Sequence, residues 1–385
     1  MPEMPEVSFE LVNSPSALEG LCTRLESLTE QDCLAADTEF EREVTFYPRL
    51  ALLQLSTADR TWLVDPLAVD LRPLAGCLCR TRAVVLLFSA AEDLELLVQL
   101  ADSAGLGRTL PPRCCDLQQL EAFAGTGYSK SLQVSLSEAL GIELQKSETR
   151  SDWMQRPLST AQLQYAAQDT AYLEALYRYC LSLFTPGDPR LEWFWDQMEQ
   201  LKGTAVSWQE PEQAYLHVSG AGTLNCAALT RLRLLCARRL VFAREHDVAL
   251  NRVITSAALC PLAAEMPYTL NGLAGCRMKW GAVREYGSMV LEWLKEAGEL
   301  PEDPDILAPL DAFSSRRENR DALRRLKHLL QEKAKLAGIC PELLSSRRAL
   351  HDYFHALHYG REPFLARGWQ HRCIGSIEVA SLFDK

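Results

Sequence analysis

AADTEF, residues 35–40, places two carboxylates side by side in a segment that otherwise has the apolar character of a β-strand. Because side chains in a strand alternate between its two faces, Asp37 and Glu39 share one face, while Thr38 and Phe40 lie on the other. The two negative charges repel each other. The segment therefore predicts either that this face is exposed to solvent or that a cation lies between the two carboxyl groups.

The first 200 residues alternate β-like runs with helical patterns, which is typical of a mixed α/β domain around a small central sheet. Expected strands lie at residues 7–12, 33–40, 49–56, 61–65 and 83–88. Expected helices lie near residues 15–27, 91–103, 131–140 and 159–183. The polar sequence TADR between the third and fourth strands predicts an antiparallel hairpin.

Strand patterns almost vanish after about residue 203. The acidic, proline-rich stretch ELPEDPDILAP (299–309) indicates a linker between two helical modules. We expect an α/β domain over residues 1–203, a helical domain over 210–298 and a second over 305–385.

Charge is distributed unevenly along the chain. Residues 1–200 contain 30 Asp and Glu against 15 Lys and Arg, whereas residues 201–385 contain 21 against 25. All seven histidines lie at or beyond His217, so histidine-based triads and histidine-ligated zinc are disfavoured in the first half. Scattered cysteines without a CxxC pair, no apparent signal peptide and no long apolar run indicate a cytoplasmic protein without a membrane partner.

Two further acids fall on apolar helical stripes. Asp93 shares a stripe with Leu96 and Leu97, and Asp169 lies one turn after Tyr165 on its own helix. Buried carboxylates are costly unless they are paired or bound to metal, and this half of the chain has few basic residues. Four carboxylates suit Mg²⁺ or Mn²⁺, and two such ions can act on both oxygens of a scissile phosphodiester. Tyr165 is a candidate to hold or deprotonate the attacking water.

Each of these signals also has a simpler structural explanation. Asp37 and Glu39 alone fit the exposed face of a half-buried strand, and Asp93 fits an acid favoured at a helix start. Tyr165 fits a core aromatic. Asp116 is most simply a helix N-cap, and it is left out of the catalytic set.

The segments AADTEF, AAEDLELL and YAAQDTAYL resemble the three exonuclease motifs of the DEDD superfamily, in the subclass whose tyrosine precedes the last Asp by four residues. The surrounding REVTFYPRLALLQLS and KSETRSDWMQRPLSTAQLQYAAQD resemble the ribonuclease D family, and the likeness extends over essentially the whole chain. It implies a ribonuclease-H-like (DnaQ-like) exonuclease domain with a mixed sheet, followed by two all-α HRDC domains.

The resemblance also implies an activity. The family hydrolyses RNA from the 3′ end with two divalent metal ions, releases 5′-mononucleotides, and matures tRNA and other small stable RNAs. The metal ligands carry over to Asp37, Glu39, Asp93 and Asp169, and the catalytic tyrosine carries over to Tyr165. One departure is Phe88, where the family usually has a histidine, which puts in doubt any substrate contact made from that position.

Several other residues are candidates for binding the substrate. A loop before the last catalytic motif carries side chains that could hold phosphates or stack on a base. The candidates are Lys146, Arg150, Trp153 and Arg156, together with Phe40 and Gln54 nearer the motifs. Arginines at 231–244 and 316–325 form basic helices that could contact RNA or could be ordinary solvated faces.

Two alternative functions remain open from the residues alone. One is a 3′–5′ exonuclease acting on DNA, because no residue pattern reads the 2′-hydroxyl. The other is a non-catalytic RNA-binding adaptor with the same fold, which the full acid set disfavours, since unused buried carboxylates would reduce stability. We expect a monomer whose partners are tRNA precursors and small structured RNAs.

Overall fold

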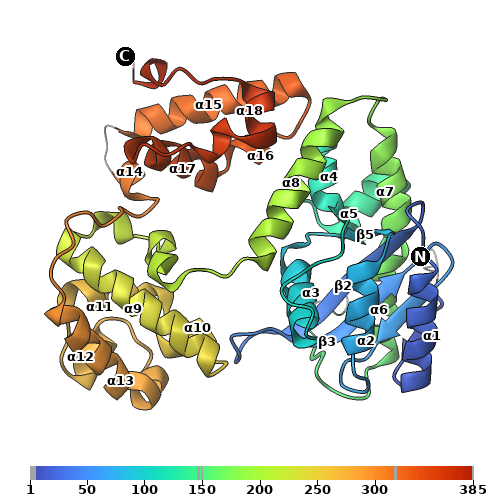
Figure 1. Cartoon of the computed structure of the whole chain (residues 1–385), viewed down its shortest axis with the longest axis horizontal. Coiled ribbons are helices and arrows are strands. Elements are labelled where there is room, and N and C mark those ends of the chain that lie inside the picture. Colours follow the sequence, from blue (N-terminus) through green and yellow to red (C-terminus); the bar gives the residue numbers. More distant parts are fainter. Residues whose placement is uncertain (1–5, 145–147, 149–150, 316–318, 384–385) are drawn as a thin grey trace. The chain divides into compact units, whose positions relative to one another are not determined.

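The computed structural model describes residues 6–144, 148, 151–315 and 319–383 (Figure 1). The chain forms two compact units, each with a hydrophobic core of its own. The first comprises Met1–Glu41, Arg49–Ser207 and Lys333–Leu343, and the second comprises Arg42–Pro48, Trp208–Glu332 and Leu344–Lys385.

A six-stranded mixed sheet forms the centre of the first unit. Its strands are β1 Glu10–Val12, β2 Cys33–Glu41, β3 Arg49–Ser56, β4 Thr61–Val64, β5 Val84–Leu87 and β6 Cys114–Asp116. They lie in the order β1-β4-β3-β2-β5-β6. The expected hairpin of β3 and β4 is confirmed as antiparallel, and β2 is antiparallel to β3 but parallel to β5.

Eight helices belong to the first unit. They are α1 Pro15–Glu26, α2 Arg72–Arg80, α3 Ala91–Ser103, α4 Leu117–Ala124, α5 Leu132–Leu140, α6 Thr160–Ala171, α7 Leu173–Ser182 and α8 Pro189–Val206. Helix α6 packs on β2, β3 and β4, and α7 packs on β2 and β5. Asp93 on α3 and Asp169 on α6 thus lie on helices that pack against the sheet.

The sequence prediction missed several elements. The single helix expected over 159–183 is in fact two, because the chain bends at Tyr172, where no glycine or proline marks the break. Helix α8, which begins at Pro189, was not among the expected helices. Proline suits the first helical turn because its missing N–H has no partner there in any case. The short elements β6 and α2 were also not expected, whereas α4 follows Asp116, the residue expected to cap a helix.

Arg156 fastens the loop before α6 to the sheet. Its guanidinium donates to both carboxyl oxygens of Asp65, at 2.7 and 2.8 Å, and to the carbonyl oxygen of Ala51 at 2.7 Å. It also donates to the carbonyl oxygen of Trp153 at 2.8 Å. Because the Asp65 side chain is only 12% exposed, this pair is far less solvated than a surface ion pair.

Helices are the main secondary structure of the described residues of the second unit. They are α9 Cys226–Glu245, α10 Leu250–Val253, α11 Ser256–Glu265, α12 Leu270–Gly275, α13 Trp280–Glu299, α14 Ala312–Ser315, α17 Arg347–His358 and α18 Gly368–Ile374. Two more helices, α15 Asn319–Ala337 and α16 Glu342–Ser345, are divided between the two units. Short 3₁₀ turns are η1 Pro211–His217, η2 Ala221–Thr223, η3 Phe364–Ala366 and η4 Ala380–Leu382. Buried side chains of α9, α11 and α13 form one core, with Leu232, Leu259 and Val290 at its centre.

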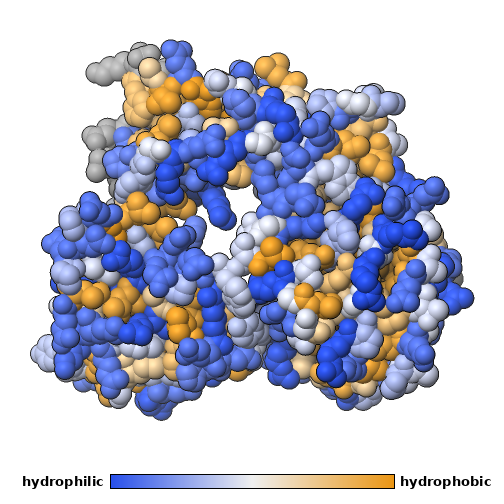
Figure 2. All heavy atoms as spheres, viewed as in Figure 1, coloured by the Kyte–Doolittle hydropathy of each residue, from blue (hydrophilic) through white to orange (hydrophobic). Residues whose placement is uncertain are grey.

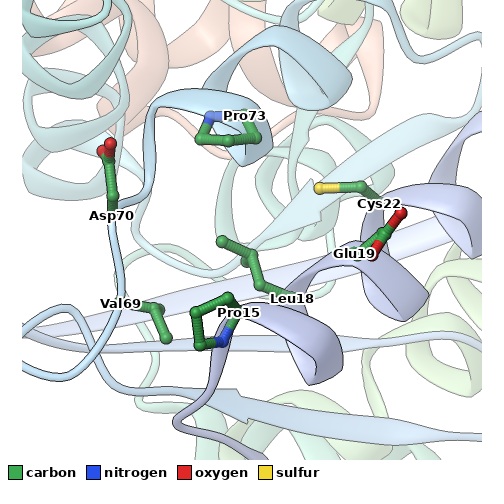
Figure 3. Close-up of a pocket in the computed structure, with 7 residues that line it drawn as sticks. All are labelled: Pro15, Leu18, Glu19, Cys22, Val69, Asp70 and Pro73. Atoms are coloured by element: carbon green, nitrogen blue, oxygen red, sulfur yellow. The ribbon is translucent and has the colours of Figure 1, made fainter.

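The division of this unit into domains over 210–298 and 305–385 stays a prediction, as does the boundary near residue 203. In the part of the chain that the structure describes, no helix is both long and apolar enough to cross a bilayer. Figure 2 shows hydrophilic and hydrophobic side chains interspersed over the visible face. A pocket of about 320 Å³ lies between α1 and the start of α2, but none of its lining residues is a predicted site residue (Figure 3).

We predict that Asp65→Asn destabilises the first unit by about 2–3 kcal/mol, because it leaves the partly buried Arg156 without its ionic partner. Hydrogen exchange of the β3 and β4 amides measures this opening free energy. Asp70→Asn is the matched control, since Asp70 pairs with Arg72 on the surface. Equal losses in the two variants would contradict the structural role of Arg156.

Candidate active site

Strand β2 positions Asp37 and Glu39. It lies inside the sheet between β3 and β5, so its backbone is hydrogen-bonded on both sides. Asp37 lies opposite Gln54, and Glu39 lies opposite Leu52, before the register shifts at Phe40. The alternation of side chains therefore directs both carboxyl groups to the same face of the sheet.

Helix α6 positions Asp169 and Tyr165. Ser159 and Gln162 form a capping box that fixes its first turn. Its buried residues are Gln162, Ala166, Ala167 and Thr170. The two alanines belong to the core shared with β3 and β4, and the hydroxyl of Thr170 shares a hydrogen bond of 2.6 Å with that of Ser56 on β3. This contact lies one residue beyond Asp169, so it holds the carboxylate against the sheet.

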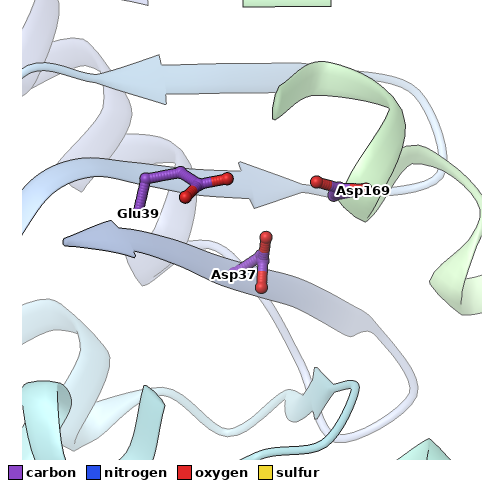
Figure 4. Close-up of side chains that lie close together, drawn as sticks. All are labelled: Asp37, Glu39 and Asp169. Carbon is purple, nitrogen blue, oxygen red and sulfur yellow. The ribbon is translucent and has the colours of Figure 1, made fainter. Parts of the chain in front are cut away.

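The carboxyl groups of Asp37, Glu39 and Asp169 converge. One oxygen from each lies within 4.8 Å of the others, and Figure 4 shows the three side chains gathered between the strand and the helix. Among the residues that the structure describes, no Lys or Arg forms an ion pair with any of them. Part of the predicted acidic set is thus brought together without a basic partner.

This crowding strongly perturbs the acids. Burial, together with the charges of Asp169 and Asp93, raises the pKa of Glu39 to about 8. Burial raises the pKa of Asp169 to about 7, against the effect of a hydrogen bond from the Tyr165 hydroxyl. Burial and the neighbouring charges of Asp93, Asp169 and Glu39 raise the pKa of Asp37 well above its usual value.

Asp93 lies beside this cluster rather than within it. It belongs to the first turn of α3 and is 6% exposed. Its Oδ1 accepts a hydrogen bond of 2.5 Å from the hydroxyl of Thr38, the residue between Asp37 and Glu39 on β2. Its charge nevertheless acts on both Asp37 and Glu39, so the four predicted carboxylates form one electrostatic group.

Asp116 orders the turn that carries Asp93. It caps α4 by accepting from the Gln118 amide, as expected, and it also accepts from the amides of Ser89 and Ala90 just before α3. Ser89 has a positive φ of 62°, an unusual backbone for a residue with a side chain. The sequence did not predict this second role, or that of Thr38, because both depend on elements distant in the chain.

The predicted substrate-binding residues have different environments. Gln54 is fully buried, and neither of its amide atoms has a hydrogen-bond partner within the described residues. Phe40 is half-buried. Trp153 is 6% exposed and packs 6.1 Å from the Tyr165 ring, while Arg156 is held by Asp65. The structure thus gives Trp153 and Arg156 packing and anchoring contacts, and their contact with substrate stays a prediction.

Two other candidates, Lys146 and Arg150, lie outside the described residues. Phe88, the departure noted from the sequence, is half-buried at the end of β5. It adjoins the turn that Asp116 holds. All four predicted carboxylates and Tyr165 are therefore described, whereas the binding set is described only in part.

The donor set fits a divalent metal ion. Three carboxyl oxygens within 4.8 Å of one another, without a basic partner among the described residues, offer the hard anionic ligands that Mg²⁺ and Mn²⁺ prefer. A cation would favour the ionised form of each acid and so offset the charge repulsion that raises their pKa values. The solvated-face explanation of Asp37 and Glu39 is disfavoured, since both residues are half-buried rather than exposed and burial is the main cause that raises both pKa values.

We predict that Asp169→Asn stabilises the metal-free protein at pH 8. The pKa of Asp169 is about 7 in the folded protein, against an ordinary value near 4. The folded state therefore binds this proton more tightly than the unfolded chain does. The stability gained in this way is fully present below pH 4 and is lost as pH rises through 7. At about 1.4 kcal/mol per pKa unit over about three units, the variant should gain on the order of 4 kcal/mol at pH 8, and the gain should shrink toward pH 5. Thermal unfolding in EDTA measures it. A gain that does not vary with pH would contradict the assignment, and Mn²⁺ should stabilise the wild type more than the variant.

We also predict that Thr38→Val raises the pKa of Asp93. The Thr38 hydroxyl lowers that pKa from the value that burial alone would impose, about 6 being the balance of these effects. Carboxyl ¹³C titration of the metal-free protein measures the change. Thr38→Ser keeps the hydroxyl and is expected to behave as the wild type, so an equal shift in both variants would show that the hydrogen bond is not the cause.

Comparison with known proteins agrees with this geometry. Residues 9–181 match the 3′–5′ exonuclease family, and residues 228–294 match the HRDC domain family. Ribonuclease D of Pseudomonas paraeruginosa is 33% identical over 91% of this chain and 92% of its own length. Ribonuclease D of Escherichia coli is 30% identical over 94% of this chain and 96% of its own.

Solved structures give the same result. The crystal structure of Escherichia coli RNase D, an exoribonuclease involved in structured RNA processing, matches with a TM-score of 0.83 at 29% identity, over 97% of this chain and 98% of that one. The catalytic core of RRP6 from Trypanosoma brucei shares the fold, with a TM-score of 0.58 at 22% identity over 78% of this chain and 84% of that one. The expected exonuclease fold followed by a helical HRDC domain is confirmed. The chain belongs to the ribonuclease D family.

Proposed function

We propose that this chain is a 3′–5′ exoribonuclease that releases 5′-mononucleotides from RNA. The observation that carries the proposal is the convergence of Asp37, Glu39 and Asp169, with Tyr165 bonded to the last of them. Ribonuclease D relatives match nearly the whole chain. A hydrolase that cleaves phosphodiesters with bound metal ions needs a site of this kind, rich in carboxylates and poor in competing cations.

We further propose that Asp37, Glu39, Asp93 and Asp169 hold two divalent ions, either Mg²⁺ or Mn²⁺. When bound, such ions lower the pKa of a bound water and stabilise charge on the phosphoryl oxygens. The protein's own residues supply the positions. Strand β2 fixes two acids at alternate residues, α6 brings the third, and Thr38 orients Asp93 from α3.

Tyr165 is the proposed water-positioning residue. Its hydroxyl donates to the Asp169 carboxylate, and its ring packs against Trp153, so both ends of the side chain are constrained. A hydroxyl held in this way can orient a water for attack on a phosphodiester. The first histidine of the chain is His217, so no histidine within residues 1–216 competes for this role.

The side-chain amide of Gln54 is proposed to hydrogen-bond to the substrate or to a water molecule bound with it. A buried amide without partners costs stability, typically 1–3 kcal/mol for each unsatisfied group. Its strand position opposite Asp37 directs it to the same face as the acids. The physiological substrates that we propose are tRNA precursors and other small structured RNAs, trimmed by a monomer in the cytoplasm.

The decisive variant is Asp93→Asn, with Glu92→Gln as its matched control. Both residues lie in the first turn of α3, but Asp93 is buried beside the other acids and Glu92 is exposed. Asp93→Asn should reduce hydrolysis by more than about 100-fold, because even the loss of an outer-sphere partner costs 10–100-fold. Glu92→Gln should retain wild-type activity.

The assay follows a 3′-extended tRNA at single-nucleotide resolution, with Mn²⁺ and with EDTA. Full activity of Asp93→Asn would refute the site. Matched RNA and DNA oligonucleotides separate the proposal from a DNA exonuclease. Metal-independent RNA binding without any hydrolysis would instead favour the non-catalytic adaptor.

A further inference from the structure

The arginines predicted on α9 to contact RNA are engaged within their own unit. Arg233 pairs with Asp303 at 2.7 Å, and Arg238 pairs with Glu296 at 2.5 Å. Arg239 is buried and donates to the carbonyl oxygen of Leu250 and to Asn251. Arg231 donates to the Ala263 carbonyl oxygen, and Arg244 lies over the Trp208 ring. Two of the five α9 arginines are thus paired with acids, and the other three are buried or half-buried, so α9 offers a polyanion little exposed cationic charge.

A different cationic segment precedes α13. The loop that joins α12 to α13 alternates between buried and exposed residues. Cys276 and Met278 are buried at 2% and 4% exposure, whereas Arg277 and Lys279 are exposed. The Arg277 carbonyl oxygen also accepts a hydrogen bond from the Thr255 hydroxyl at 3.4 Å. Buried Cys276 and Met278 thus anchor the loop, while the side chains of Arg277 and Lys279 lie in solvent.

An aromatic side chain and further cations adjoin this loop. Trp280, the first residue of α13, is 56% exposed. Arg284 is exposed one turn later, on the same side of the helix. Arg252 on α10 lies close enough to α13 for its charge to lower the pKa of Tyr286, against the larger effect of burial. Trp280 thus lies next to exposed cationic residues in the loop and on α13, and it has no evident role in packing its own unit.

These cations are not neutralised. Within the described residues, Arg252, Arg277, Lys279 and Arg284 form no ion pair. Residues 251–288 contain four Lys and Arg against two Asp and Glu, namely Glu265 and Glu285. Glu265 approaches the Cys276 thiol, and Glu285 accepts from the Tyr286 hydroxyl, so both acids have other contacts. The segment keeps a net positive charge in a chain whose overall charge is −11.

We propose that Arg252, Arg277, Lys279, Trp280 and Arg284, here called the α13-start surface, bind single-stranded RNA. The Trp280 ring stacks on a base, and the four cations contact neighbouring phosphates. Stacking accepts any base, and phosphate contacts are independent of sequence, as a processing nuclease requires. The choice of RNA rests on the proposed function, while the location rests on exposure and unpaired charge.

The test measures binding apart from hydrolysis. Fluorescence anisotropy of a labelled 20-nucleotide single-stranded RNA is followed with the full chain in EDTA, for wild type, Trp280→Ala and Lys279→Glu. Lys295→Glu is the matched control, because Lys295 is also exposed on α13 but lies 16 residues further on, about 24 Å along the helix axis. Trp280→Ala should raise Kd about tenfold, within the range for loss of one stacked base. Lys279→Glu should raise Kd and reduce the slope of log K against log salt by about 0.7.

Two results would overturn the α13-start surface. One is an unchanged Kd for Trp280→Ala. The other is an equal loss for Lys295→Glu and Lys279→Glu, which would indicate diffuse attraction rather than a site. Hydrolysis of a trinucleotide with Mn²⁺ is measured in parallel and should not change in any of these variants. If the wild type fails to cleave it, the proposed function fails, whereas the binding result is judged separately.

Discussion

Mutual repulsion among buried carboxylates is the constraint on which the exonuclease unit depends. Burial raises the pKa values of Asp37, Glu39 and Asp169, like charge raises those of Asp37 and Glu39 further, and no basic residue of the described chain pairs with them. An arrangement of this kind opposes folding unless something positive occupies it. The rest of the unit serves to keep these groups in place, with a central strand, a capped helix and a hydroxyl pair between Ser56 and Thr170.

Positioning in this site uses hydrogen bonds to which no basic side chain contributes. The Thr38 hydroxyl donates to Asp93, the Tyr165 hydroxyl donates to Asp169, and the Asp116 carboxyl group accepts from the backbone of the turn before α3. These contacts order the site without neutralising the negative charge that would attract a cation. Arg156, in the loop before α6, is instead paired with Asp65 and with backbone carbonyl oxygens. The charge of this arginine is used to anchor the loop.

Much of this site could be predicted from local periodicity. The alternation in AADTEF predicted that Asp37 and Glu39 share a face, and helical spacing predicted Tyr165 beside Asp169; both predictions agree with the structure. The roles of Thr38 and Asp116 could not be predicted, because their partners lie 55 and 27 residues away in the chain. The bend at Tyr172 was missed because no glycine or proline causes it. In the helical unit, the α9 arginines were recognisable as cations, but their acidic and carbonyl partners come from other segments.

The central claim is that the convergent acids form a metal site. Anomalous diffraction from crystals soaked in Mn²⁺ tests it most directly. We expect anomalous peaks between the carboxyl groups of Asp37, Glu39 and Asp169, and none there in crystals of Asp37→Asn. Wild-type crystals without such peaks at saturating Mn²⁺, with each carboxylate paired to a lysine or arginine, would contradict the claim.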